Sequence, residues 1–163
     1  MVKAFEMIDL SEHVRRAIAA HAEQTYPHEC VGLVLGRIEG GVKVAEDVFA
    51  AQNTWTAEVG LTSAEHAHSQ RDRFYLDPRD YLRADRAARA GGLDIIGCYH
   101  SHPDHPAVPS ERDRTGAQGV GAGTLFSFLI QSVRDGQAAE LTSWLLADEG
   151  TRFVSEELRN RST

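Results

Sequence analysis

An apolar run that ends at a proline-rich segment constrains the fold more than any other feature of this chain. Residues 93–100 read LDIIGCYH, which is apolar and β-prone and predicts a buried strand. Three prolines follow within residues 103–109. Because proline has no N–H to donate to a neighbouring strand, residues 103–109 are expected to be irregular. The pattern predicts a core strand that leads directly into a loop, where functional residues often lie.

The rest of the chain predicts a mixture of helices and strands. Ser11 precedes apolar residues at helical spacing that continue to Pro27, and Asp77-Pro78 opens a second helix that Gly91-Gly92 ends. A third helix is expected at residues 110–118. Strands are expected at residues 2–8, 30–38, 42–50, 73–76, 124–133 and 138–147, and residues 151–158 fit an edge strand or a final helix.

Length and composition are those of one compact domain. The chain has 163 residues, of which 42% are hydrophobic and 25% are charged. This is enough for one hydrophobic core and too little for two, so residues 1–163 are expected to form a single domain. We expect an α/β sandwich in which helices flank a mixed sheet. It should fold alone, as a monomer, a homodimer or one piece of an assembly.

One predicted connection is unusually long. Residues 51–71 are polar and follow neither the helical nor the strand period, which predicts a loop of about 20 residues. Trp55 within it fits either a contact with a partner or an aromatic anchor for the loop itself.

Charge and cysteine content argue against several protein classes. With 17 Lys and Arg against 24 Asp and Glu, the formal net charge is -7, so nucleic acid is not the expected partner. No run approaches about 18 apolar residues, which argues against a membrane span, and residues 1–14 lack the apolar stretch of a signal peptide. The two cysteines, Cys30 and Cys98, lie in predicted core strands and fit packing in a reducing compartment. We expect a soluble cytoplasmic protein.

The number of histidines is unusual, because the chain has eight histidines and only two cysteines. Any metal is therefore expected to be bound by His and carboxylates. His100 and His102 lie two residues apart on a predicted strand and so share a face. Asp113, brought back by the loop onto the first turn of a helix, can supply a third ligand. Two His and one carboxylate, with a fourth position left to water, are typical of a catalytic zinc site.

Each part of this pattern also has an ordinary explanation. His66-Ala67-His68 is a second pair with the same spacing, so a His-x-His pair alone is weak evidence. Ser110-x-x-Asp113 alone indicates a capping box, although a capped helix start is also a rigid place for a ligand. The combined pattern with Pro103 is expected by chance roughly 10⁻⁴ times or less, so only the full pattern is specific.

The full pattern, His100-x-His102-Pro103-x₆-Ser110-x-x-Asp113, resembles the signature of the JAMM/MPN+ metalloproteases. Residues 26–33, YPHECVGL, resemble the family segment in which a Glu precedes a Gly-containing core strand. Together with Asn53, the helix that starts at Asp77-Pro78 and the hairpin at Asp135-Gly136, the likeness covers nearly the whole chain.

The resemblance implies an MPN domain, similar in fold to cytidine deaminases, with Zn²⁺ bound by His100, His102 and Asp113. It implies that Glu29 is the general acid/base and that Ser110 hydrogen-bonds the water or the developing oxyanion. Prokaryotic relatives cut peptide or isopeptide bonds after the C-terminal Gly-Gly of ubiquitin-like or sulfur-carrier β-grasp proteins, and one subgroup releases cysteine. The resemblance therefore implies such a carrier as partner. We hypothesise that the tail of the carrier pairs with a sheet edge and that the loop at residues 51–71 helps to hold the carrier.

Three other assignments fit less well. A non-catalytic MPN scaffold, a binding module in an assembly, needs none of the three ligands, Glu29 or Ser110, and it remains the alternative. The RadC-like branch has His-Asn-His-Pro-Ser-Gly, where this chain has Ser101 and Asp104. A zinc nucleoside deaminase also requires Pro-Cys-x-x-Cys, which this sequence lacks.

Overall fold

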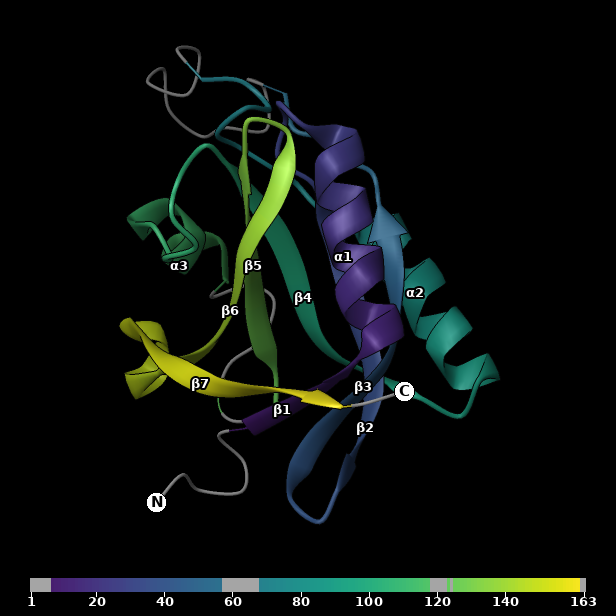
Figure 1. Cartoon of the computed structure of the whole chain (residues 1–163). Coiled ribbons are helices and arrows are strands. Elements are labelled where there is room, and N and C mark those ends of the chain that lie inside the picture. Colours follow the sequence, from purple (N-terminus) through teal and green to yellow (C-terminus); the bar gives the residue numbers. More distant parts are fainter. Residues whose placement is uncertain (1–6, 57–67, 118–122, 124, 162–163) are drawn as a thin grey trace.

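The computed structural model describes residues 7–56, 68–117, 123 and 125–161. Figure 1 shows the elements, which follow the chain in this order: β1 (Met7–Ser11), α1 (Glu12–Thr25), β2 (Val31–Glu39), β3 (Val42–Ala51), α2 (Pro78–Ala90), β4 (Asp94–Pro103), α3 (Glu111–Ala117), β5 (Ser127–Arg134), β6 (Gln137–Ala147), the 3₁₀ helix η3 (Asp148–Gly150) and β7 (Arg152–Arg161).

The strands form one mixed sheet that closes on itself in the order β1-β3-β2-β4-β5-β6-β7. Strand β1 is parallel to both β3 and β7, and β7 is antiparallel to β6. The prediction of a mixed α/β fold is therefore correct, but the sheet is a closed barrel rather than a layer of a sandwich. The physical reason is β7, which joins the two ends of the sheet, because residues 152–156 pair with β6 and residues 157–161 pair with β1.

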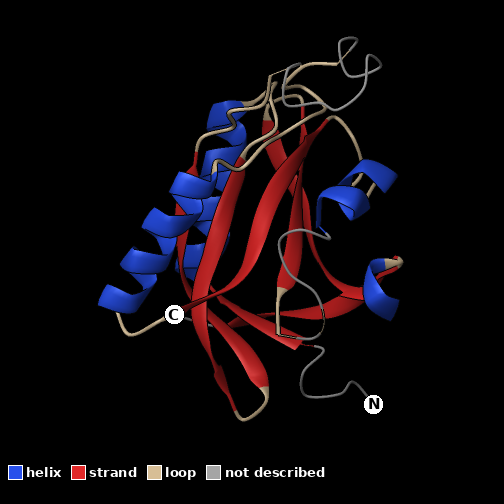
Figure 2. Ribbon diagram, turned by 180° about the vertical axis from the view of Figure 1, so that it is seen from behind, coloured by secondary structure: helices blue, strands red, loops and turns tan. Residues whose placement is uncertain are grey.

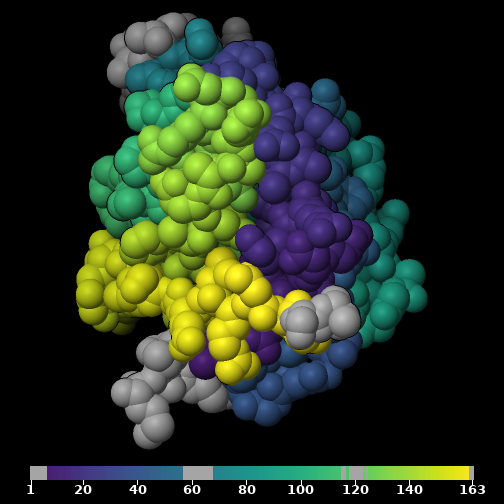
Figure 3. All heavy atoms as spheres, in the orientation of Figure 1, coloured from purple at the N-terminus to yellow at the C-terminus, as the bar shows by residue number. Residues whose placement is uncertain are grey.

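Helices cover both faces of the sheet (Figure 2). Helix α1 buries Val14, Ile18 and Ala22 in the largest hydrophobic cluster, which also includes residues of β1, β4 and β5. On the other face, α2 packs against Leu33 and Leu35 of β2, and α3 packs near Phe128 of β5. Val34, between these two leucines, lies in the cluster of α1, so successive β2 residues face different helices, as the two-residue period of a strand requires. Figure 3 shows α1 lying directly against the β5–β6 hairpin.

The predicted helix starts and ends are confirmed. The Ser11 hydroxyl accepts a hydrogen bond from the Val14 N–H at 3.2 Å and caps α1. The Asp77 carboxylate accepts one from the Arg79 N–H at 2.9 Å and caps α2, which ends at Gly91. Local sequence signals determine these helices, because a cap and its partner lie within three residues of each other.

Several predicted boundaries need correction. The segment at residues 103–109 is not irregular throughout, because Pro103 is the last residue of β4 and is paired in register with Val133. This is possible because the strand ends there and the next N–H, that of Asp104, donates to the Val133 carbonyl at 2.6 Å. Residues 73–76 form no strand and make one isolated bridge, between Asn53 and Leu76.

Two predicted segments lie largely outside the described residues. Of the strand expected at residues 2–8, only Met7 and Ile8 are described, and they begin β1. Residues 57–67 of the expected long loop are not described either. Among the helices that the structure describes, none is both long and apolar enough to cross a lipid bilayer.

Candidate metal centre

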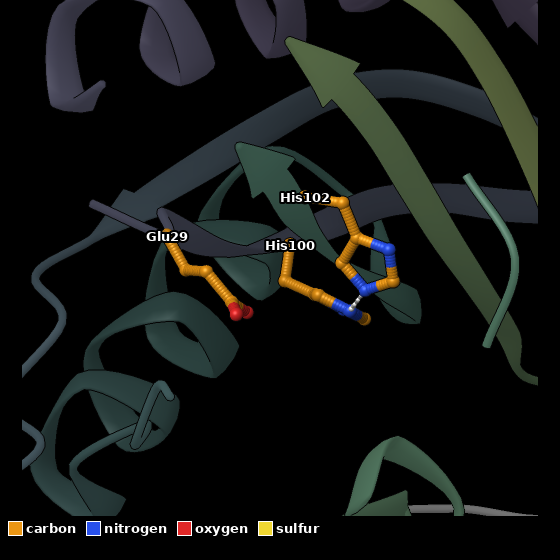
Figure 4. Close-up of side chains that lie close together, drawn as sticks. All are labelled: Glu29, His100 and His102. Carbon is orange, nitrogen blue, oxygen red and sulfur yellow. Dashed lines mark hydrogen bonds between the residues drawn. The ribbon is translucent and has the colours of Figure 1, made fainter. Parts of the chain in front are cut away.

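The end of β4 brings two imidazoles together. His100 and His102 extend to the same side of the strand, as their spacing predicts, and their Nε2 atoms lie 3.1 Å apart (Figure 4). Both side chains are buried. The Nδ1 atom of His102 lies 2.8 Å from the Pro106 carbonyl oxygen. When Nδ1 donates its proton to this carbonyl, Nε2 has a free lone pair directed toward His100.

Two hydrogen bonds to backbone carbonyls hold the loop after β4, residues 104–110, against the barrel. Ser132 in β5 donates its hydroxyl to the His105 carbonyl at 2.6 Å, and Thr142 in β6 donates to the Ala107 carbonyl at 2.7 Å. These bonds hold residues 104–110 against β5 and β6. They determine where the chain re-enters the site at the start of α3.

Helix α3 starts at a reciprocal pair of hydrogen bonds. The Asp113 N–H donates to the Ser110 hydroxyl at 3.0 Å, and the Ser110 N–H donates to the Asp113 carboxylate at 2.9 Å. The same carboxylate lies 3.3 Å from the His100 Nε2 and 3.1 Å from the His102 Nε2. The capping box and the contact with both imidazoles therefore coexist, since one oxygen of Asp113 accepts from Ser110 while both oxygens face the histidines.

The donor set fits a zinc ion. Ligand atoms about 2.0–2.1 Å from a tetrahedral Zn²⁺ lie about 3.3 Å from one another. The Nε2 atoms of His100 and His102 lie 3.1 Å apart, one Asp113 oxygen lies 3.3 Å from His100 Nε2, and the other lies 3.1 Å from His102 Nε2. Burial alone would raise the pKa of the Asp113 carboxyl, but the two imidazoles outweigh burial and lower it. A carboxylate oxygen and two imidazole nitrogens are among the ligand atoms that Zn²⁺ prefers in proteins.

Glu29, just before β2, lies beside this donor set. Its carboxylate and the nitrogens of His100 and His102 lie within 4.8 Å of one another, and the Glu29 side chain is buried (Figure 4). Burial raises the pKa of the Glu29 carboxyl well above its usual range. The carboxylates of Asp113 and Asp72 act in the same direction, and the nearby guanidinium of Arg73 opposes them.

The family assignment follows from comparison with known proteins. A family model described as prokaryotic homologues of the JAB domain matches residues 11–147. The chain belongs to this family. The match spans the elements from α1 to β6 and includes every residue of the donor set.

Individual JAB-domain relatives were found by sequence and by structure. A protein named "Probable TtuB-protein conjugate cleaving protease" from Thermus thermophilus is 35% identical over 94 residues, 58% of this chain and 52% of that protein. The chain thus spans about half the length of that relative. A desampylase from Haloferax volcanii is 30% identical over 70% of this chain and 75% of its own length.

The barrel itself also has solved counterparts. The solution structure of a protein from Desulfitobacterium hafniense superposes with a TM-score of 0.76 at 28% identity, covering 96% of this chain and 94% of that one. The fold is therefore shared with that solved structure over almost the full length of both chains.

One aromatic contact in this JAB domain was not anticipated. The ring of Phe74 stacks on the His100 imidazole, with centroids 4.6 Å apart and planes 24° from parallel. Phe74 lies within residues 73–76, which were expected to form only a short strand. No local pattern indicates the contact, because the two rings are 26 positions apart in the sequence.

A pocket opens beside the donor set. Its volume is about 710 Å³, and His100 and Asp113 line it together with apolar side chains such as Phe74, Phe128 and Ile130. An extended peptide could therefore reach the donor set along a largely apolar wall.

The other histidines that the structure describes lie outside the donor set, as do both cysteines. The His68 Nδ1 lies 2.6 Å from the Asp72 carboxylate. His66, the other histidine of the His66-Ala67-His68 pair, lies outside the described residues. His105 is exposed. Cys30 is a buried free thiol, and Cys98 is a partly buried one that also lines the pocket. Burial raises the pKa of each to about 12.

Proposed function

We propose that this JAB domain is a zinc-dependent hydrolase of peptide or isopeptide bonds that follow the C-terminal Gly-Gly of a ubiquitin-like or sulfur-carrier β-grasp protein. The observation that carries the proposal is the convergence of three buried donors, from His100, His102 and Asp113, with the Glu29 carboxylate beside them. A non-catalytic scaffold has no need of such a set.

In this proposal, His100, His102 and Asp113 would hold Zn²⁺. When bound, the ion would supply Lewis acidity and make water acidic enough to lose a proton near neutral pH. Glu29 accepts that proton, and its raised pKa lets it deliver the proton to the leaving amine afterwards. The Ser110 hydroxyl accepts from the Asp113 N–H, which leaves its own proton to donate to the developing oxyanion.

The substrate class is supported by the names of two relatives, a conjugate-cleaving protease and a desampylase. Pairing of a Gly-Gly tail with a sheet edge stays a prediction, since residues 137–142 of β6 pair with β5 alone. We infer that the scissile end of the tail lies in the pocket beside His100 and Asp113. Glycines suit this approach because they let the backbone come close to the reacting groups.

The test is cleavage of β-grasp carriers extended beyond Gly-Gly by the zinc-loaded protein. We expect cleavage after the second glycine, its loss with a chelator, and a fall of about 10²–10⁴-fold in Glu29→Gln without loss of zinc. Asp113→Asn should lose zinc itself. Glu111→Gln is the matched control, since Glu111 lies on the same helix but is exposed and paired with Arg114.

Two results would count against the proposal. Cleavage that continues with chelator present would overturn the metal mechanism. If the zinc-loaded protein binds carriers but leaves all of them intact, the scaffold alternative is the better description.

A further inference from the structure

Asn53, which follows β3, uses every hydrogen-bonding position of its side-chain amide. Its Nδ2 donates to the Glu29 carbonyl and to the Arg73 carbonyl, each at 2.9 Å. Its Oδ1 accepts from the Trp55 N–H at 3.0 Å and from the Tyr75 N–H at 3.1 Å. Two donors and two acceptor sites are all that an Asn side chain has. One side chain therefore joins Glu29 to both described ends of the connection between β3 and α2.

Gln70 completes the support of the Glu29 backbone. Its carbonyl accepts the Glu29 N–H at 2.7 Å, and its side-chain amide donates to the carbonyls of Asn53 and Trp55 at 3.1 and 3.0 Å. The backbone N–H and C=O of Glu29 are thus both bonded to this pair. Trp55 is only 4% exposed, which favours its interpretation as an anchor of the segment rather than a partner contact.

The Asn53 amide also holds the backbone on both sides of Phe74, whose ring packs on the predicted metal ligand His100. Phe74 lies between Arg73 and Tyr75, whose backbone groups are the two that Asn53 holds on this side. The Phe74 ring stacks on His100. A displacement of the Asn53 amide would therefore move Glu29 and Phe74 together.

We propose that Asn53 is a positioning residue of the metal centre, which holds the Glu29 carboxylate and the Phe74–His100 stack in their working arrangement from outside the donor set. The proposal rests on the function proposed above, in which Glu29 transfers the proton. A displacement of about 1 Å at such a group can cost about 10²-fold in rate. Substrate binding should change little, because the four bonds of Asn53 are all internal to the protein.

The test uses two substitutions of Asn53 with different hydrogen-bonding capacity. Asn53→Asp keeps the acceptor for Trp55 and Tyr75 but loses the donors to Glu29 and Arg73, whereas Asn53→Ala loses both. We expect each variant to lower kcat for an extended carrier at least tenfold and to leave KM within twofold. If only the bonds to Trp55 and Tyr75 mattered, Asn53→Asp would retain most of the activity that Asn53→Ala loses.

Thr54→Ala is the matched control, because Thr54 bonds the Tyr75 carbonyl at 3.3 Å in the same segment and does not contact Glu29. It should leave kcat unchanged. If Asn53→Asp fails to fold, Gln70→Ala takes its place, with the same direction of change expected. An unchanged kcat in a folded Asn53→Asp or Gln70→Ala variant, or an equal loss in Thr54→Ala, would overturn the proposal.

Two further measurements separate this inference from the proposed function. In Asn53→Asp loaded with Co²⁺, the visible absorption bands should shift, because the stack on His100 moves. Hydrogen exchange at the Glu29 amide should become at least tenfold faster, while Thr54→Ala leaves both signals unchanged. If the wild type cleaves no carrier, the proposed function fails, but unchanged spectra and exchange in Asn53→Asp would be needed to reject the positioning role.

Discussion

At the scale of single residues, Ser101 shows how one side chain holds two parts of the site together. It lies between His100 and His102, and its side chain therefore faces the opposite side of β4. There its hydroxyl accepts the Cys30 N–H at 2.8 Å, while the Cys30 carbonyl accepts the Ser101 N–H at 3.2 Å. Because Cys30 follows Glu29 directly, this pair sets the distance between Glu29 and the two imidazoles.

Replacement of Ser101 should show how much the hydrogen bond from the Cys30 N–H to its hydroxyl contributes to stability. Ser101→Ala leaves the buried Cys30 N–H without its acceptor, which should lower the free energy of unfolding by about 1–3 kcal/mol. Ser101→Thr keeps the hydroxyl and should cost less. Urea unfolding of the two variants measures the difference, and equal stability of Ser101→Ala and the wild type would show that the bond contributes nothing.

At the scale of elements, strands β2 and β4 approach closely where Gly32 lies over Tyr99. A Cβ at position 32 would lie 2.3 Å from the Tyr99 ring and hydroxyl, much closer than non-bonded atoms tolerate. The Tyr99 ring is fully buried, and its hydroxyl lies 2.7 Å from the His21 Nδ1 of α1. Because Gly32 has no side chain, the Tyr99 ring of β4 can occupy this space and contact His21 of α1.

Gly32→Ala should therefore destabilise the protein through overpacking. The Tyr99 ring has no free space to move into, so we expect a loss of about 1–3 kcal/mol in thermal or urea unfolding. Gly91→Ala is a suitable comparison, because the nearest atom to a Cβ there is 3.6 Å away. A Gly32→Ala protein as stable as Gly91→Ala would contradict this account.

Helix α2 should show a pH-dependent contribution from its cap. The side chain of Arg79 and then the Arg79 N–H lower the pKa of Asp77 from 3.8 to about 2. The carboxylate therefore adds stability that is fully present above about pH 4 and is lost as the pH falls through about 2. In Asp77→Asn the cap remains but does not titrate. We expect the stability difference between the wild type and Asp77→Asn to shrink between pH 5 and pH 2 in urea unfolding, and a constant difference would disprove it.

At the scale of the whole molecule, the barrel closes around a buried ion pair. Lys43 in β3 and Glu156 in β7 lie 2.6 Å apart, and both side chains are fully inaccessible to solvent. The hydroxyls of Ser127 in β5 and Ser143 in β6 donate to the other oxygen of Glu156 at 2.6 and 2.8 Å. Strand β3 and the three C-terminal strands β5, β6 and β7 therefore meet at one carboxylate.

Loss of one partner of this pair should be costly. Lys43→Met leaves the Glu156 carboxylate buried without its cation, and we expect a loss of about 3–5 kcal/mol in urea unfolding. The double variant Lys43→Met with Glu156→Gln should recover part of this, because a neutral amide oxygen still accepts from both serines. If the double variant is less stable than Lys43→Met alone, the uncompensated charge is not the cause.

Local patterns were sufficient for much of the fold and for the two histidines of the site. The spacing of His100 and His102 puts both on one face of a strand, and Ser11 and Asp77 cap the helices that follow them. Each of these inferences depends on groups within a few residues of one another, where backbone geometry alone decides the outcome.

By itself, the sequence determined the order and type of most elements, the shared face of the two histidines and the pattern that led to the family. The tertiary structure alone decided that β7 closes the barrel, that Phe74 stacks on His100 and that the Asn53 amide holds Glu29. These features join residues about 20 to 150 positions apart. They have no local periodicity, because they depend on how the whole chain packs around one core.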